Sequence, residues 1–186
     1  ASKLELLTQR RTQFEPKLIG DTMVDYLTMI ENRMAGLHKP IQTGYTHFDE
    51  LMGGGLERGT LTVVAGRPGT GKTAFGLGAA RNVALDGGVS AIFSMEMAAA
   101  QLNDRNMAAI GKIPLAWLRS PNENDTDSPY WGMLSHATHK AREMKMWIDE
   151  QAGMNMIELR AKARKIKRKT GLDILVIDQL SFITGG

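Results

Sequence analysis

The sequence predicts an α/β fold built on a mostly parallel sheet. Residues 61–65 are apolar and rich in β-branched side chains, which favours a buried strand, and residues 74–80 favour a helix. Residues 172–178 are almost continuously aliphatic, a pattern typical of a parallel strand that is covered on both faces. At 186 residues the chain is long enough for one domain with a substantial core.

A glycine-rich stretch between the first predicted strand and helix carries the functional prediction. Its residues are Gly66, Arg67, Pro68, Gly69, Thr70, Gly71, Lys72 and Thr73. A strand, a glycine-rich turn, Gly-Lys-Thr and a helix in that order form a phosphate-binding loop. The glycines let backbone amides point at phosphate oxygens, and the helix start adds partial positive charge. We predict that Lys72 reaches the outer phosphates and that the Thr73 hydroxyl holds Mg²⁺. The alternative is a purely structural turn.

The composition is that of a globular protein without a disulfide framework. The net charge of +3, from 23 basic and 20 acidic side chains, is too small to indicate nucleic-acid binding by itself. The chain has no Cys, which excludes disulfides and thiolate metal sites. Because we find no bilayer-length apolar run and no signal-peptide pattern, we expect a cytoplasmic protein with no membrane partner.

A helix is predicted ahead of the core, after residues 1–15, which support at most a short helix or the end of a linker. Its apolar side chains recur on one helical face. They are Met23, Tyr26, Leu27, Ile30 and Met34. Asp21 is the expected N-cap and Gly36 the expected stop. The helix packs either on its own domain or on a neighbouring subunit, and its place ahead of the Pro- and Gly-containing residues 36–44 suits the second alternative.

A second strand is predicted at residues 89–94, followed by a helix at 98–110. Glu96 comes between them. A carboxylate at the carboxyl end of a strand lies on the sheet edge where ligands bind, so Glu96 is a candidate for activating the water that attacks a terminal phosphate. The alternative is an acid that only complements a helix dipole.

The middle of the chain predicts a polar, mobile surface loop at residues 120–128, a helix at 130–145 and a short strand at 146–149. We expect Trp131 and Trp147 to serve in packing rather than in base stacking, because no aromatic cluster accompanies them in the sequence.

A basic run lies on a helix predicted to begin near Asn155. Its members are Arg160, Lys162, Arg164, Lys165, Lys167, Arg168 and Lys169. Such a run is more often a solvated helix face than a nucleic-acid contact, and both interpretations stay open.

Asp178 closes the strand at residues 172–178. After a phosphate loop, an acid in this position is expected to hold the Mg²⁺ water shell beside Thr73. A turn-forming role is the alternative.

Several stretches carry a family resemblance. They are residues 44–49, 53–56, 66–73, 93–97 and 176–180, with residues 158–164 similar as well. Together they resemble the C-terminal motor domain of the replicative hexameric helicases of the DnaB family, over about residues 19–183.

The resemblance implies a RecA-like fold, with helices on both faces of the sheet, and ATP hydrolysis with Mg²⁺ between subunits of a hexameric ring. It implies translocation on single-stranded DNA and unwinding of forked DNA, with primase and a helicase loader as candidate partners. Lys72 and Glu96 are then catalytic, Thr73 and Asp178 hold the metal, and residues 66–73 bind the nucleotide. Residues 1–40 become a linker region with a subunit-docking helix, and 41–186 an ATPase core that is incomplete at its C-terminus.

The sequence departs from the family pattern at two places. Gly69-Thr70 stands where Ser-Met is usual, and Gln179 where an aromatic residue is common, which indicates a divergent, phage-type member. The family's DNA-contacting loops and arginine finger are expected beyond Gly186, so hydrolysis by this chain is expected to be slow. Two alternatives remain: a RadA- or RecA-like recombination ATPase, and a nucleotide-binding assembly module without turnover.

Overall fold

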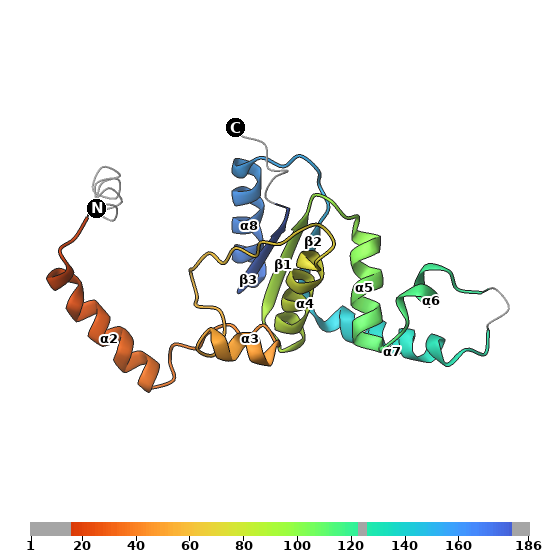
Figure 1. The fold of residues 1–186 in the computed structure, drawn as a ribbon, viewed down its shortest axis with the longest axis horizontal. Helices are drawn as coiled ribbons and strands as arrows, with labels where there is room; N and C mark the ends of the chain where they lie inside the picture. The colour runs from red at the N-terminus through yellow and green to blue at the C-terminus, as the bar shows by residue number, and fades with distance from the viewer. Residues whose placement is uncertain (1–15, 123–125, 180–186) are drawn as a thin grey trace. The chain divides into compact units, whose positions relative to one another are not determined.

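The computed structural model describes residues 16–122 and 126–179 (Figure 1). The prediction for residues 1–15 lies outside these ranges. The chain divides into two units between Lys39 and Pro40.

The described part of the first unit is helical. A short 3-10 helix, η1 (Ile19–Thr22), leads directly into α2 (Met23–Met34). The expectation that Asp21 caps this helix is wrong, because Asp21 lies inside η1 and Thr22 holds the cap position without a capping hydrogen bond. Gly36 follows the helix end as predicted, with a φ of +68° that favours glycine.

The apolar stripe of α2 is not buried within the first unit. No residue of α2 is buried, and the exposed fraction is 59% for Leu27 and 85% for Met34. The helix therefore forms as the periodicity predicts, while the described residues of the first unit alone do not bury its apolar face.

The second unit is built around a parallel sheet, as predicted. The strand order is β2 (Lys145–Asp149), β1 (Val89–Ser94), β3 (Ile174–Asp178). Both pairings are parallel, with Ile92 of β1 aligned with Val176 of β3. All of β1 is buried, which its run of apolar and small side chains allows.

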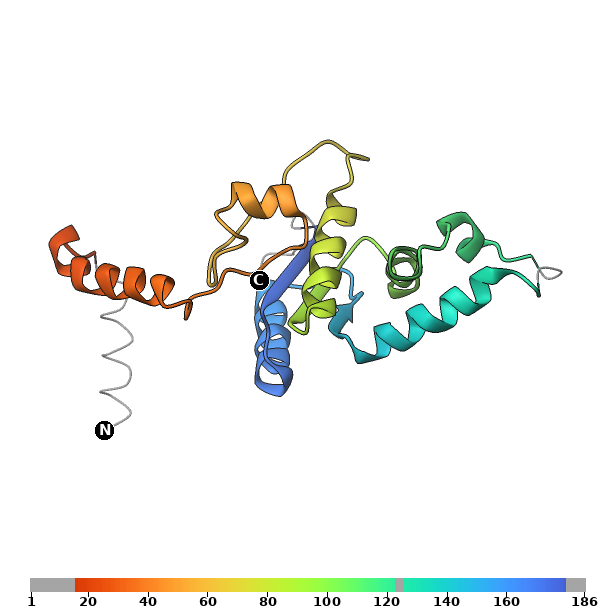
Figure 2. The ribbon, with the colours of Figure 1, turned by 90° about the horizontal axis from the view of Figure 1, so that it is seen from below.

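Helices cover both faces of this sheet, which gives the α/β RecA-like fold. The helices α4 (Lys72–Leu85) and α5 (Ala99–Gly111) lie on one face and α8 (Met156–Thr170) on the other (Figures 1 and 2). The first core contains Leu77, Ile92 and Leu102. The second contains Ala91, Phe93, Met154, Leu159 and Ile166. Alternate side chains of β1 thus enter opposite cores.

Three further helices complete the second unit: α3 (Thr46–Leu51), α6 (Leu115–Arg119) and α7 (Pro129–Glu143). The described residues between α6 and α7 form no helix or strand, in agreement with the predicted loop, and residues 123–125 lie outside the described ranges. None of the helices in those ranges is both long and apolar enough to span a membrane.

Both tryptophans pack against other side chains, as expected, but the expectation that no aromatic cluster accompanies them is wrong for Trp131. Trp147 packs against the second core, as predicted. Trp131, however, belongs to an aromatic cluster: its ring centroid lies 5.1 Å from that of Trp117, which lies 5.3 Å from that of Tyr130. The partner ring comes from α6, so the cluster depends on the packing of α6 against α7 and is not visible as a local run of aromatic residues.

The prediction of a buried strand at residues 61–65 is wrong. These residues form no strand, and Leu61 and Val63 are 84% and 64% exposed. A strand needs a hydrogen-bonding neighbour along its edge. The outer edge of β3 has no partner among the described strands, but a cavity separates residues 61–65 from β3 and these residues make no backbone hydrogen bond to it. The apolar, β-branched segment is therefore unpaired although an edge of the described sheet is free.

Candidate nucleotide site

The predicted phosphate loop leads directly into α4. Gly71 is the N-cap of that helix, with a φ of +93°, and Gly69 has a φ of +78°. Both values favour glycine. Lys72 and Thr73 are the first two helical residues, and their amides donate to no acceptor within the described residues. The loop thus presents unpartnered amides at a helix N-terminus, a geometry that suits an anion.

Lys72 is folded back onto the loop. Its Nζ donates to the carbonyl oxygens of Gly66, at 3.0 Å, and Arg67, at 3.1 Å. The Thr70 hydroxyl donates to the same Arg67 oxygen over 2.8 Å. A Cβ on Gly66 would lie 2.7 Å from that hydroxyl, so a larger residue there would displace the Thr70 side chain. These bonds hold the loop in shape, and the ammonium group must leave them to reach a phosphate.

Residues 43–49 hold α4 in place. The Asp49 carboxylate accepts from the Thr43 amide at 3.0 Å and the Thr43 hydroxyl at 2.7 Å. The Thr43 carbonyl in turn accepts from Asn82 of α4 over 2.9 Å. Tyr45 stacks on Phe75 with 4.9 Å between ring centroids. These contacts give the polar and aromatic side chains of residues 43–49 a structural role. They hold in place the helix whose first residues form the candidate site.

A cavity of about 480 Å³ joins the loop to the end of β3. Gly66, Lys72 and Thr73 line it, as do Asp178 and Gln179, and residues 61–65 and 174–177 form further parts of its wall. Arg67, Pro68, Gly69, Thr70 and Gly71 do not line it. The structure thus brings the predicted phosphate-binding and metal-binding side chains to one place, although the chain separates them by more than a hundred positions.

The oxygens of this cavity fit a hydrated Mg²⁺ ion. Asp178 Oδ2 is buried and has no hydrogen-bond partner in the described structure, and the Thr73 hydroxyl makes no hydrogen bond with a described residue. An unpartnered buried carboxylate oxygen is costly unless a cation or ordered water satisfies it. Within the described ranges, no group of three or more His, Cys, Asp and Glu is placed to hold a metal by itself. Such a site suits Mg²⁺ that keeps several waters and binds phosphate.

Glu96 lies at the same sheet edge but outside the cavity. The Met95 amide donates to the Asp178 carbonyl over 2.7 Å, which ties the start of the Glu96 loop to the end of β3. The Met97 amide donates to the Ser94 hydroxyl over 3.0 Å. The Glu96 side chain itself is exposed and does not line the cavity. Its loop is therefore fixed while its carboxylate points to solvent.

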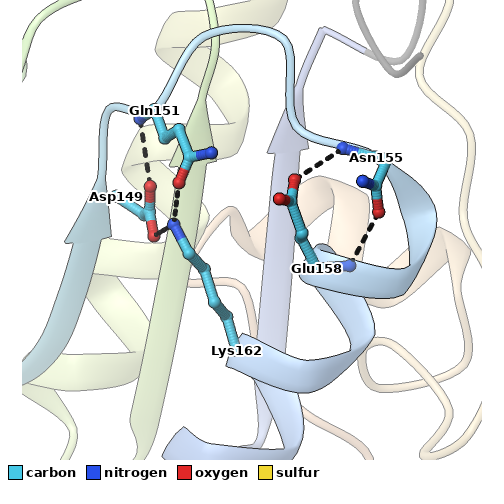
Figure 3. Close-up of polar contacts among 5 residues, drawn as sticks. All are labelled: Asp149, Gln151, Asn155, Glu158 and Lys162. Atoms are coloured by element: carbon cyan, nitrogen blue, oxygen red, sulfur yellow. Dashed lines mark hydrogen bonds and ion pairs between the residues drawn. The ribbon is translucent and has the colours of Figure 1, made fainter.

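Two acids at the end of β2 were not predicted as part of this edge. Asp149 pairs with Lys162 of α8, which also donates to Gln151 Oε1 over 2.7 Å (Figure 3). Glu150 accepts a hydrogen bond from the Ala99 amide at the start of α5. Consecutive acids directly after a strand are the sequence signal that could have indicated them.

Lys162 enters this edge from α8, which begins at a capping box. Asn155 Oδ1 accepts from the Glu158 amide over 2.9 Å, and the Glu158 carboxylate accepts from the Asn155 amide over 3.2 Å (Figure 3). This cap confirms the predicted start of the basic helix near Asn155.

An ion pair lies at the amino ends of the strands, opposite the candidate site. It joins the segment before the phosphate loop to the residue before β3. Arg58 Nη1 lies 2.7 Å from Asp173 Oδ1, and the Val89 amide donates to Asp173 Oδ2 over 2.8 Å. The hydrogen bond from the Val89 amide and the contact with Arg58 hold the pKa of Asp173 below its usual range.

Comparisons with known proteins agree on one family. The family model described as the DnaB-like helicase C-terminal domain matches residues 40–186. The replicative DNA helicase DnaC of Bacillus subtilis is 38% identical over 183 residues, which cover 96% of this chain and 39% of that protein. The replicative DNA helicase DnaB of Geobacillus stearothermophilus is 37% identical over 187 residues, covering 98% of this chain and 40% of that protein. The chain thus spans about two fifths of the length of these relatives.

Solved structures show the same relationship. A DnaB-like replicative helicase, solved in a study of its interactions with primase, superposes with a TM-score of 0.78 at 27% identity, covering 91% of this chain and 40% of that one. The ATPase domain of G40P superposes with a TM-score of 0.77 at 27% identity, covering 91% and 60% of the two chains.

Proposed function

The chain belongs to the DnaB-like helicase C-terminal domain family, and from this membership we propose that it is part of the ATP-hydrolysing motor of a replicative DNA helicase. In this proposal the motor works as a hexameric ring, moves along single-stranded DNA and separates a forked duplex.

The observation that carries the proposal is the shared cavity of Lys72, Thr73 and Asp178. The unpartnered amides of the loop suit the phosphates of ATP, and Lys72 supplies a cation to them. Thr73 and Asp178 would hold Mg²⁺, which neutralises charge that builds up on the phosphates during transfer.

Glu96 is proposed as the base that orients and deprotonates the attacking water. Its loop is tied to Asp178 through the Met95 amide, so the two carboxylates lie at the same edge of the sheet. A Glu96 side chain that lies outside the cavity reaches a phosphate only if the ligand extends beyond the cavity or the loop moves.

The exposed stripe of α2 supports the proposed ring. Its apolar side chains are not buried within the first unit, and a neighbouring copy of the chain is the proposed partner. A related solved helicase is described with primase, which makes primase a proposed partner here; a helicase loader is proposed from the family resemblance alone.

The direct test is ATP binding and turnover in Lys72→Ala. We expect turnover to fall about 100- to 1000-fold, because a cation at the transferring phosphate is lost. Lys140→Ala, an exposed lysine of α7, is the control and should behave as the unmodified chain. Normal ATPase activity in Lys72→Ala would overturn the nucleotide site. A forked-duplex assay then separates a helicase from a recombination ATPase, which would hydrolyse ATP without unwinding.

The position of Glu96 favours one alternative, a nucleotide-binding module without turnover. Its carboxylate is exposed and outside the cavity. Tight ATP binding by the chain, with no turnover even at high protein concentration, is the result expected for that alternative.

A further inference from the structure

The loop that carries Glu96 is held on both sides of that residue. Within the loop, Ser94 Oγ accepts a hydrogen bond from the Met97 amide over 3.0 Å and donates one to the Met97 carbonyl over 2.9 Å. After the loop, the Ala99 amide donates to the carboxylate of Glu150, which directly follows β2. The second contact therefore joins the end of the Glu96 loop to a different strand of the sheet.

Helix α5 has no capping side chain of its own. Its N-cap is Ala98, and its first two helical residues are Ala99 and Ala100, whose side chains hold no acceptor. Gln101 Oε1 accepts from the Ala98 amide over 3.3 Å, but this bond lies within the helix end and moves with it. The bond to Glu150 is therefore the contact that ties the first amide of α5 to the end of β2.

The turn that contains Glu150 is held on both sides by one lysine. Lys162 of α8 pairs with Asp149 and donates to Gln151 Oε1 over 2.7 Å (Figure 3). The Gln151 amide donates to Asp149 Oδ1 over 3.0 Å, which closes the turn around Glu150. Because both of its neighbours are fastened, Glu150 is a fixed anchor for the start of α5.

Glu150 lies one strand farther from the nucleotide cavity than Glu96 does. The strand order is β2, β1, β3, so the end of β2 lies two strand spacings, or about 10 Å, from the end of β3 at Asp178. Glu96 follows β1, which is next to β3, and the Met95 amide bonds to the Asp178 carbonyl over 2.7 Å. An acid after β2 can therefore affect chemistry in the cavity through the Glu96 loop.

We propose that Glu150 is a positioning residue, which sets the place of the Glu96 carboxylate by fixing the start of α5. The inference rests on the proposed function, in which Glu96 is the base. The Glu96 side chain is exposed and outside the cavity, so the path of its loop decides whether it reaches the attacking water. With the loop fixed, the terminal phosphate must extend out of the cavity toward Glu96. A displacement of about 1 Å can slow a reaction on the order of a hundredfold.

A purely structural role is the alternative. Glu150 is exposed, and an acid beside a helix N-terminus also stabilises the helix by complementing its dipole. That role predicts a less stable α5, with ATP turnover by the folded protein unchanged.

The test compares ATP turnover and ATP affinity in Glu150→Ala and Glu150→Gln. Glu150→Ala removes the acceptor, so kcat should fall about 10- to 100-fold while ATP affinity stays unchanged. Glu150→Gln keeps an oxygen that can accept from the Ala99 amide, and it should recover most of that loss. Equal losses in the two variants would mean that the charge of Glu150 takes part directly, which contradicts a positioning role.

The matched control is Gln101→Ala, which removes the other bond at the same helix end and leaves the tie to β2. We expect its kcat to stay near that of the unmodified chain. Hydrogen exchange at the Ala99 amide should become faster in Glu150→Ala and stay slow in Glu150→Gln. The proposal is overturned by full turnover or unchanged exchange in Glu150→Ala, or by a loss of turnover in Gln101→Ala as large as that in Glu150→Ala.

Lys72→Ala, measured alongside, separates this proposal from the nucleotide site. Loss of turnover in Lys72→Ala, together with full turnover in Glu150→Ala, would overturn the role of Glu150 alone. Normal turnover in Lys72→Ala, or none in the unmodified chain, would overturn the proposed function and the role of Glu150 in hydrolysis with it.

Discussion

Helices α4 and α8 pack on opposite faces of one sheet, yet they differ in how much of each is buried. Helix α4 has six buried residues and only two charged side chains, Lys72 and Arg81. Helix α8 is one residue longer, has two buried residues and carries eight charged side chains. The first is held by packing on many sides, and the second by one narrow apolar face.

Because of this difference in burial, the two helices present positive charge in different ways. Helix α4 is held by its core and by residues 43–49, through contacts of Phe75, Leu77 and Asn82. A helix held in this way suits a compact ligand that needs exact placement, such as a nucleotide with Mg²⁺. Helix α8 offers long cationic side chains along its exposed flank.

The largest effect is expected from a change at Glu96, which tests whether ATP is hydrolysed at the face of the sheet that α4 covers. Glu96→Gln keeps the size of the side chain but removes the base, so ATP turnover should fall about 10²- to 10⁴-fold while ATP binding stays. Glu143→Gln, at an exposed site on α7, is the control and should keep full turnover. Loss of ATP binding in Glu96→Gln would mean that Glu96 is structural, and full turnover would remove it from the chemistry.

Two core variants test whether α4 is held more firmly by packing than α8. Leu77→Ala in α4 and Leu159→Ala in α8 each remove a buried side chain, 1% and 4% exposed. Each should lower the free energy of unfolding by about 2–5 kcal/mol, measured by urea denaturation. Leu77→Ala should cost more, because Leu77 packs against both β1 and α5. A larger loss for Leu159→Ala would contradict the view that α4 is the more firmly held helix.

A smaller effect on stability is expected from the ion pair of Arg58 and Asp173 at the amino ends of the strands. The pKa of Asp173 is lowered by the Val89 amide and Arg58, so the folded carboxylate stabilises the protein at pH values above its ordinary pKa. That stability is lost as the pH falls through the lowered folded pKa. Asp173→Asn should reduce stability at neutral pH by about 1 kcal/mol, discounted for partial exposure, and flatten the dependence on pH below about pH 4. An unchanged acid-unfolding curve would show that the pair does not contribute.

Local patterns predicted the elements whose signals lie within one segment. The aliphatic run of β3, the stripe of α2 and the cap at Asn155 each depend on neighbouring residues, and each element forms as expected. The strand at residues 61–65 failed because a strand also needs a paired edge, which no local sequence guarantees.

The sequence predicted the individual residues of the candidate site but not their arrangement in space. The sequence predicted Lys72, Thr73 and Asp178 separately, and the fold brings them to one cavity. Contacts such as the Ala99 amide with Glu150 and Arg58 with Asp173 join residues 51 and 115 positions apart. Such pairs depend on the parallel crossovers of the sheet and leave no local pattern.

The central claim is that the N-terminus of α4 and the end of β3 form one Mg²⁺–nucleotide site. ATP affinity, measured with and without Mg²⁺ in the unmodified chain and in Asp178→Asn, tests it most directly. We expect Mg²⁺ to strengthen ATP binding in the unmodified chain, and we expect Asp178→Asn to lose that gain while it keeps Mg²⁺-free binding, because the buried Oδ2 acceptor is replaced. An equal gain from Mg²⁺ in both proteins would contradict the claim.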